Sequence, residues 1–180
     1  MVLIYRIESS KEYNQKLYDE IYAEYDNVYD NTNVVSKVED LNNRAKKYLQ
    51  NENIIGEIRI DKINLKLPIL YETTEELLKI APTKYSGQAI NGIGNLVIIG
   101  HNYYDGTHFS NLNNLSIGDE VILTDLNKKS CTYEVFDKEI ISPKDFSCLA
   151  EDKNNLKSFV TLITCINGVD NRLVVKCVEK

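Results

Sequence analysis

A cysteine, a histidine and an arginine stand at the ends of predicted strands, where they could cooperate in nucleophilic catalysis. Cys165 ends the apolar segment 159–165, and Arg172 opens the segment 172–178 after a loop that contains Gly, Asn and Asp. Such a loop favours a hairpin, in which facing strand-end residues lie about 5 Å apart. A guanidinium beside a thiol favours the thiolate and can also stabilise an oxyanion. We therefore expect Cys165 and Arg172 to be neighbours at one sheet edge.

A histidine also follows a buried segment of strand type. His101 comes directly after the apolar segment 95–100. In barrel folds, catalytic and binding side chains are commonly exposed at the ends of strands. A thiol with a pKa of about 8.5 is only slightly ionised at neutral pH, so an imidazole is useful as proton acceptor and later as donor. The other histidine, His108, lies in the loop 105–109. It lacks the strand-end setting and is the weaker candidate.

Each of these residues also has an ordinary structural interpretation. A cysteine at the end of an apolar strand is most often an inert core residue, and an arginine that begins a strand most often forms a surface ion pair. The 4 cysteines include no C-x-x-C pair and are too sparse for a disulfide framework: Cys131, Cys148, Cys165 and Cys177. Too few histidines accompany them for a zinc site. We expect buried cysteines or one reactive thiol, and neither a metal nor a cofactor.

Composition excludes several classes of function. The net charge of -6 and the pI near 5.0, without any cluster of Lys and Arg, argue against binding of nucleic acid. The longest apolar runs are far shorter than the roughly 20 residues that cross a bilayer, so we expect the chain as given to be soluble. The segment 1–5 fits either a natural start or the remainder of a membrane anchor.

The period of the apolar residues changes near residue 54. Before it, two stripes at helical spacing predict two helices: Tyr13, Leu17, Ile21, Tyr25 and Val28, then Val34, Val38, Leu41, Ala45 and Tyr48. We expect residues 1–53 to be a helical appendage packed on a catalytic domain of residues 54–180. A lid or a partner-binding role would use similar stripes.

From residue 54 onward the sequence predicts strands. Alternating or continuous apolar segments occur at 54–60, 63–70, 95–100, 120–124, 131–136, 159–165 and 172–178. Turn-rich segments separate them at 86–94 and 115–119, and only short helices such as 75–80 fit between them. Many short strands without long crossover helices favour a mainly β fold, a largely antiparallel closed barrel.

Three segments, taken together, resemble the sortases of Gram-positive bacteria. They are Leu96-Val-Ile-Ile-Gly-His-Asn102, Thr161-Leu-Ile-Thr-Cys165 and Arg172-Leu-Val-Val175, in the same order along the chain. The segment 58–69 is similar to the opening strands of that family, and 109–121 is similar to its middle. The resemblance covers residues 54–180, and T-L-x-T-C followed by Arg is its most specific part.

The resemblance implies a membrane-anchored extracellular enzyme with a closed eight-stranded sortase-type barrel. Such an enzyme cleaves a Leu-Pro-x-Thr-Gly-like sorting signal between Thr and Gly through a thioester. It passes the acyl group to an amine, such as a peptidoglycan cross-bridge or a pilin lysine. By the same resemblance Cys165, His101 and Arg172 are catalytic, Thr164 borders the substrate groove, and the span 142–158 shapes recognition of the signal.

The subclass and two other functions stay open. Paired N-terminal helices are similar to those of pilin-polymerising members, but the sequence has no Asp-Pro-aromatic lid motif. The short loop between Cys165 and Arg172 makes class B less natural, and no pattern of carboxylates predicts a calcium site. A cysteine peptidase without transfer would use the same thiolate and imidazole. A non-catalytic β-barrel binding module would keep Cys165 in its core.

Overall fold

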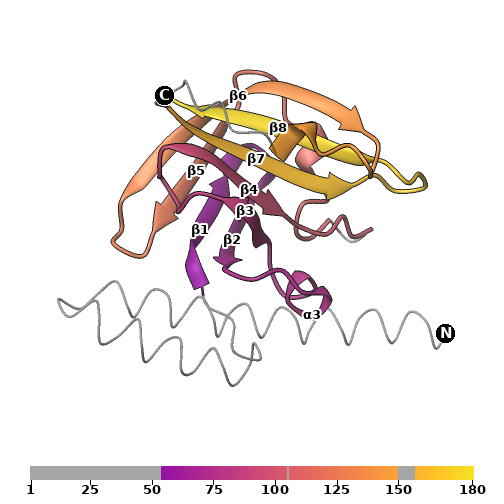
Figure 1. The fold of residues 1–180 in the computed structure, drawn as a ribbon, viewed down its shortest axis with the longest axis horizontal. Coiled ribbons are helices and arrows are strands. Elements are labelled where there is room, and N and C mark those ends of the chain that lie inside the picture. The colour runs from indigo at the N-terminus through magenta and orange to yellow at the C-terminus, as the bar shows by residue number, and fades with distance from the viewer. Residues whose placement is uncertain (1–53, 105, 150–156) are drawn as a thin grey trace. The chain divides into compact units, whose positions relative to one another are not determined.

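The computed structural model describes residues 54–104, 106–149 and 157–180 of the chain, and Figure 1 shows them as a closed barrel of strands. The two helices expected within residues 1–53, and their packing, lie outside the described residues. The strands are β1 Ile54–Ile60, β2 Leu65–Leu70, β3 Thr83–Gly87, β4 Gly94–Ile99, β5 Glu120–Asp125, β6 Ser130–Ile141, β7 Ser158–Cys165 and β8 Arg172–Glu179. Short helices lie between them: η1 Asp61–Ile63, α3 Glu75–Leu78, η2 Leu112–Asn114 and η3 Ser147–Leu149.

The order of the strands around the barrel is β1-β2-β3-β4-β7-β8-β6-β5, with β5 closing on β1. Most neighbours are antiparallel, but β2 pairs with β3, and β4 with β7, in parallel. The expected mainly β, closed eight-stranded and largely antiparallel barrel is confirmed. The parallel pair β4–β7 brings together two strand ends that are far apart in the sequence.

Alternation along the strands fills the barrel interior with apolar side chains. In β7, Val160 and Leu162 point into the core, as do Leu173 and Val175 in β8. Other strands and the segment after β4 complete this cluster with fully buried residues: Ile58, Ile60, Ile69, Ile98, Phe109, Leu112, Val121, Leu123 and Val135. Each such side chain contributes about 1.5–3 kcal/mol on burial, which gives β4, β7 and β8 a rigid framework.

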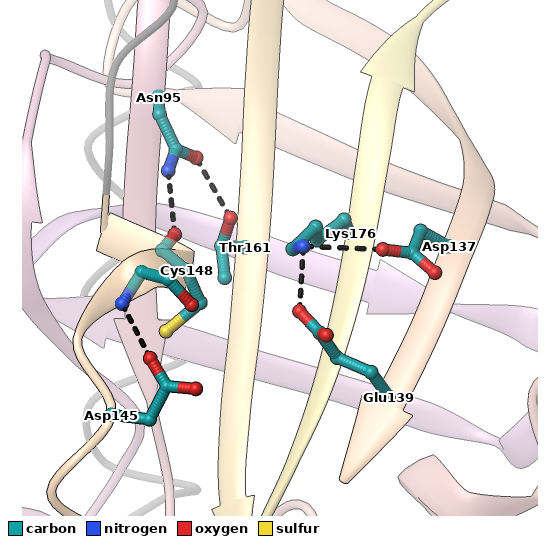
Figure 2. A network of polar contacts seen from close by, with 8 residues as sticks. Asn95, Asp137, Glu139, Asp145, Cys148, Thr161 and Lys176 are labelled. Atoms are coloured by element: carbon teal, nitrogen blue, oxygen red, sulfur yellow. Dashed lines mark hydrogen bonds and ion pairs between the residues drawn. The ribbon is translucent and has the colours of Figure 1, made fainter. Parts of the chain in front are cut away.

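The segment after β6 packs on the outer face of this framework. Cys148 lies against Ile141, Val174 and the partly buried Ile163. Figure 2 shows how the backbone there is fixed: the Nδ2 of Asn95 donates to the carbonyl of Cys148 at 3.2 Å. The Oδ1 of Asn95 accepts from the hydroxyl of Thr161 at 2.9 Å. The start of the β6–β7 connection is thus joined to β4 and β7.

The predicted segments differ from the observed strands where alternation fails. β3 was not predicted, because its residues Thr83–Gly87 carry little apolar character. β6 continues to Ile141, beyond the predicted end at residue 136, because a shift of register between Val135 and Asp137 interrupts its pattern. The short helix expected at 75–80 is α3, whose first turn is capped by the Thr74 hydroxyl accepting from Leu77 N at 3.2 Å.

Candidate active site

Cys165 and Arg172 face one another across the last pair of the β7–β8 ladder. The connecting loop closes with a hydrogen bond from Ile166 N to Asn171 O of 3.1 Å. Gly168 turns the chain with a φ of 83°, a conformation that glycine adopts without strain. The predicted hairpin neighbours are confirmed, and strand geometry places their Cβ atoms about 5 Å apart.

His101 reaches the same edge through the parallel pairing of β4 with β7. Ile99 is in register with Ile163, and Gly100 N donates to Ile163 O at 3.1 Å. Beyond that point, two side-chain bonds hold the residues on either side of His101 to the end of β7. The Thr164 hydroxyl donates to Gly100 O at 2.7 Å, and the Nδ2 of Asn102 donates to Cys165 O at 2.7 Å. The structure therefore brings the three predicted catalytic residues to one end of adjacent strands, in the order His101, Cys165, Arg172.

The environment of His101 favours the neutral imidazole. Its pKa is lowered by partial burial and, to a smaller extent, by the positive charge of Lys79, against an opposing effect of Glu75. A neutral imidazole can accept a proton from a thiol. Glu75 belongs to α3 and Lys79 is its C-cap, so the β2–β3 connection shapes the electrostatics of this histidine. Sequence reasoning missed that influence, because nothing in the sequence places α3 near His101.

Arg172 keeps a charge that is only weakly satisfied by the protein. Its side chain is about one third exposed, and the carboxylate of Asp170 lies 3.8 Å from Nη1. Nη1 also donates to the carbonyl of Asn171 at 3.2 Å. Asp170 is itself 91% exposed, and exposed pairs contribute little. The guanidinium is therefore able to bind an anion that forms at Cys165.

Cys165 differs from the other cysteines in exposure. All 4 are free thiols, and Cys165 is exposed while Cys148 and Cys177 are buried. Burial raises the pKa of Cys177 to about 12 and also raises that of Cys148. Burial, reinforced by the nearby Glu179 carboxylate, raises the pKa of the partly buried Cys131. A reactive thiolate is least favourable at these three positions.

Thr164 points away from Cys165, into the barrel. Its side chain is 3% exposed, and its hydroxyl donates to the carbonyl of Gly100 at 2.7 Å. In this arrangement Thr164 connects the ends of β7 and β4. A contact between Thr164 and substrate, which the sequence resemblance implies, stays a prediction.

Two further polar residues, His108 and Asn102, belong to the segment that follows β4. His108, the weaker acid–base candidate, is 5% exposed, and its ring stands edge-on to Tyr103 with centroids 4.9 Å apart. The Nδ2 of Asn102 donates to the carbonyl of Cys165 at 2.7 Å. On sequence alone Asn102 has no role of its own beyond following His101, because its contact with Cys165 depends on a pairing between distant strands.

Within the described residues, no group of three or more His, Cys, Asp or Glu side chains is close enough to hold a metal ion. The same residues contain no helix of the length and apolar character that crossing a membrane requires. The eight residues of the span 142–158 nearest its start, 142–149, include the anchored Cys148. Of the rest of this span, residues 150–156 lie outside the described part, while residues 157 and 158 are described and Ser158 begins β7.

Comparisons with known proteins agree with this geometry. Residues 58–180 match the family model of the sortase domain. Sortase A of Bacillus anthracis is 32% identical over 133 residues, which cover 73% of this chain and 61% of that protein. The chain thus spans less than two thirds of the length of this curated relative.

Solved structures with the same barrel are also sortases. The pilus-related sortase C of Group B Streptococcus has 30% sequence identity and a TM-score of 0.64, covering 71% of this chain and 67% of that one. A sortase D5 transpeptidase of Clostridium perfringens has 25% identity and a TM-score of 0.67, covering 93% and 98%. With the family model covering most of the barrel, the chain belongs to the sortase family of cysteine transpeptidases.

Proposed function

We propose that this chain is a sortase transpeptidase that forms a thioester on Cys165 and transfers the acyl group to an amine. The observation that carries the proposal is the pairing of an exposed thiol, at the end of β7, with a guanidinium at the start of β8. The register of β4 with β7 adds His101 to this pair. The substrate is a peptide with a Leu-Pro-x-Thr-Gly-like sorting signal, as the sequence resemblance implies.

In the first half of the reaction, an imidazole nitrogen of His101 takes the proton of the Cys165 thiol. The sulfur attacks the threonine carbonyl carbon of the signal, and a C–S bond forms. Arg172 stabilises the oxyanion, a contribution of about 3 kcal/mol for one well-placed donor. The C–N bond to glycine then breaks, and the imidazolium gives its proton to the departing amino group.

In the second half, an acceptor amine attacks the thioester. His101 takes a proton from the attacking nitrogen, the C–S bond breaks, and the proton returns to the Cys165 sulfur. The acceptor is an amine such as that of a peptidoglycan cross-bridge or a pilin lysine. The reaction takes place at the extracellular face of the membrane of a Gram-positive bacterium.

The deciding experiment incubates the purified chain with sorting-signal peptides, with and without triglycine, and follows the products by mass spectrometry. A transpeptidase gives the ligated product in preference to the free acid. Free acid alone in the presence of the amine indicates a cysteine peptidase without transfer. No turnover with any signal, together with a Cys165 that resists alkylation, indicates a non-catalytic binding module.

Replacing the proposed nucleophile has the largest expected effect. Cys165→Ala abolishes turnover while leaving the melting temperature nearly unchanged, because an exposed sulfur at a strand end leaves no buried cavity. Cys131→Ala is the matched control and keeps the activity. Cleavage by purified Cys165→Ala would remove the assignment of the nucleophile.

The two histidines provide a second comparison. His101→Ala loses most of the turnover, because the proton acceptor next to Cys165 is gone. His108→Gln keeps much of it, since His108 is buried against Tyr103. Initial rates of both variants on one peptide test this. The reverse order would move the general acid–base role to His108.

A further inference from the structure

We propose that Asn102 is a positioning residue that holds the His101 segment against Cys165. The inference rests on the proposed function, because it assigns Asn102 a task in the same reaction. Its basis is the hydrogen bond from the Nδ2 of Asn102 to the carbonyl of Cys165, 2.7 Å long.

The chain leaves the β4–β7 ladder just before His101. The backbone bond from Gly100 N to Ile163 O continues the ladder beyond Ile99, the end of β4. After it, Phe109 N donates to His101 O at 3.0 Å, and Asn102 forms an isolated antiparallel bridge with His108. The backbone around His101 is therefore paired with the segment 108–109.

The side chain of Asn102 replaces a backbone hydrogen bond between the two strands. A regular parallel ladder would next use the backbone N–H of residue 102 as donor to the carbonyl of residue 165. Here the side-chain amide of Asn102 donates to that carbonyl. A second bond runs from the Thr164 hydroxyl to Gly100 O at 2.7 Å. The residue before His101 is thus bonded to Thr164, and the residue after His101 is bonded to Cys165.

Such a tie matters because proton transfer between thiol and imidazole needs atoms within about 2.6–3.2 Å. A displacement of about 1 Å in a reacting group can cost about a hundredfold in rate. Among the described residues, the Asn102 side chain is hydrogen-bonded to the Cys165 carbonyl and to Asn167, and neither of these groups reacts. Its loss is expected to lower kcat through the geometry of His101 and Cys165 and to leave KM nearly unchanged.

Asn167 offers a matched control. Its Nδ2 donates to the Oδ1 of Asn102 at 3.4 Å, which is long for such a bond. Asn167→Ala therefore removes a contact to the same amide while leaving the bond from Asn102 to Cys165. Asn102→Gln keeps an amide donor on a side chain one methylene longer.

The experiment measures kcat, KM and melting temperature for Asn102→Ala, Asn102→Gln and Asn167→Ala, beside His101→Ala and Cys165→Ala. We expect kcat of Asn102→Ala to fall tenfold to a hundredfold, with KM within threefold of the parent. Asn102→Gln should recover part of the lost kcat. Asn167→Ala should keep kcat within threefold of the parent. A kcat for Asn102→Ala within threefold, or Asn102→Gln as slow as Asn102→Ala, would overturn the inference. Turnover by Cys165→Ala, or undiminished turnover by His101→Ala, would instead overturn the proposed function.

Discussion

Arg172 and Lys176 lie on the same outer face of β8, four positions apart, and their surroundings are very different. Lys176 forms ion pairs with Glu139 at 2.6 Å and Asp137 at 3.1 Å, both supplied by β6, as Figure 2 shows. Arg172 faces Cys165 and Ile141 in its ladders. Among the described residues its ion-pair partner is Asp170, at 3.8 Å.

The difference separates a cation that is paired with two carboxylates of the neighbouring strand from one whose ion pair is weak. Partial burial would lower the pKa of Lys176, but its hydrogen bonds and ion pairs to Glu139 and Asp137 outweigh that effect and raise the pKa above its usual value. Its charge is thus paired with carboxylates of the neighbouring strand β6 on the outer face of the barrel. The charge of Arg172, at the loop end of the hairpin, has only the exposed Asp170 as an ion-pair partner among the described residues, which agrees with the proposed role in binding an anion at Cys165.

Of the two cations, Arg172 should have the larger effect on turnover when it is replaced, and Arg172→Lys is the informative variant. The ammonium keeps a charge but loses the fixed, planar set of donors, so we expect kcat to fall about a hundredfold, as for one oxyanion donor of about 3 kcal/mol. KM should change less than kcat, and Arg172→Ala should be slower still. If Arg172 instead forms only a surface ion pair, both variants will be active and lose at most about 1 kcal/mol of stability.

Lys176→Met should show the opposite pattern. Its ion pairs are partly exposed, with side-chain exposures of 27% for Lys176, 43% for Asp137 and 37% for Glu139. We expect a loss of about 1 kcal/mol in the free energy of unfolding, after allowing for solvent screening, and kcat within threefold of the parent. Chemical denaturation and peptide kinetics measure the two quantities. A hundredfold loss of kcat at unchanged stability would erase the distinction between the two cations.

Much of this arrangement follows from local sequence pattern. The hairpin that pairs Cys165 with Arg172 was predictable, since the loop between two apolar strands is short and carries turn residues. The strand end at Gly100 was predictable from the apolar run before His101. Both predictions need only residues that are neighbours in sequence.

What the sequence did not provide is pairing between distant segments. The parallel register of β4 with β7 joins residues more than sixty positions apart, as Asn102 and Cys165 are, and periodicity within one strand does not specify its neighbour. The position of α3 near His101 depends on how the β2–β3 connection folds relative to the end of β4, which the strand pattern does not specify. The bond of Asn102 and the influence of Lys79 depend on such contacts between separate segments, so both became visible only in the structure.

The smallest effect concerns Lys79, the C-cap of α3, which acts on the pKa of His101. Removing its charge in Lys79→Met should raise the pKa of His101, because an imidazolium is then less repelled, while Glu75→Gln should lower it further. Both side chains are exposed, so the shifts should shrink as salt is added. NMR titration of the imidazole C–H signals measures them, with His101→Gln to assign the resonances and His108 as the internal reference.

The lowered pKa of His101 also predicts how the free energy of unfolding changes with pH. Since the folded imidazole of His101 has a lowered pKa, the unfolded chain binds this proton more readily, and stability is lost as pH falls below the unfolded value of about 6.5. His101→Gln should remove this part of the loss, and Lys79→Met should reduce it. Denaturant unfolding between pH 7.5 and 5.5, compared among the parent and both variants, measures the slopes. A slope in the parent no steeper than in His101→Gln would contradict the lowered pKa and, with it, the neutral imidazole on which proton transfer from Cys165 depends.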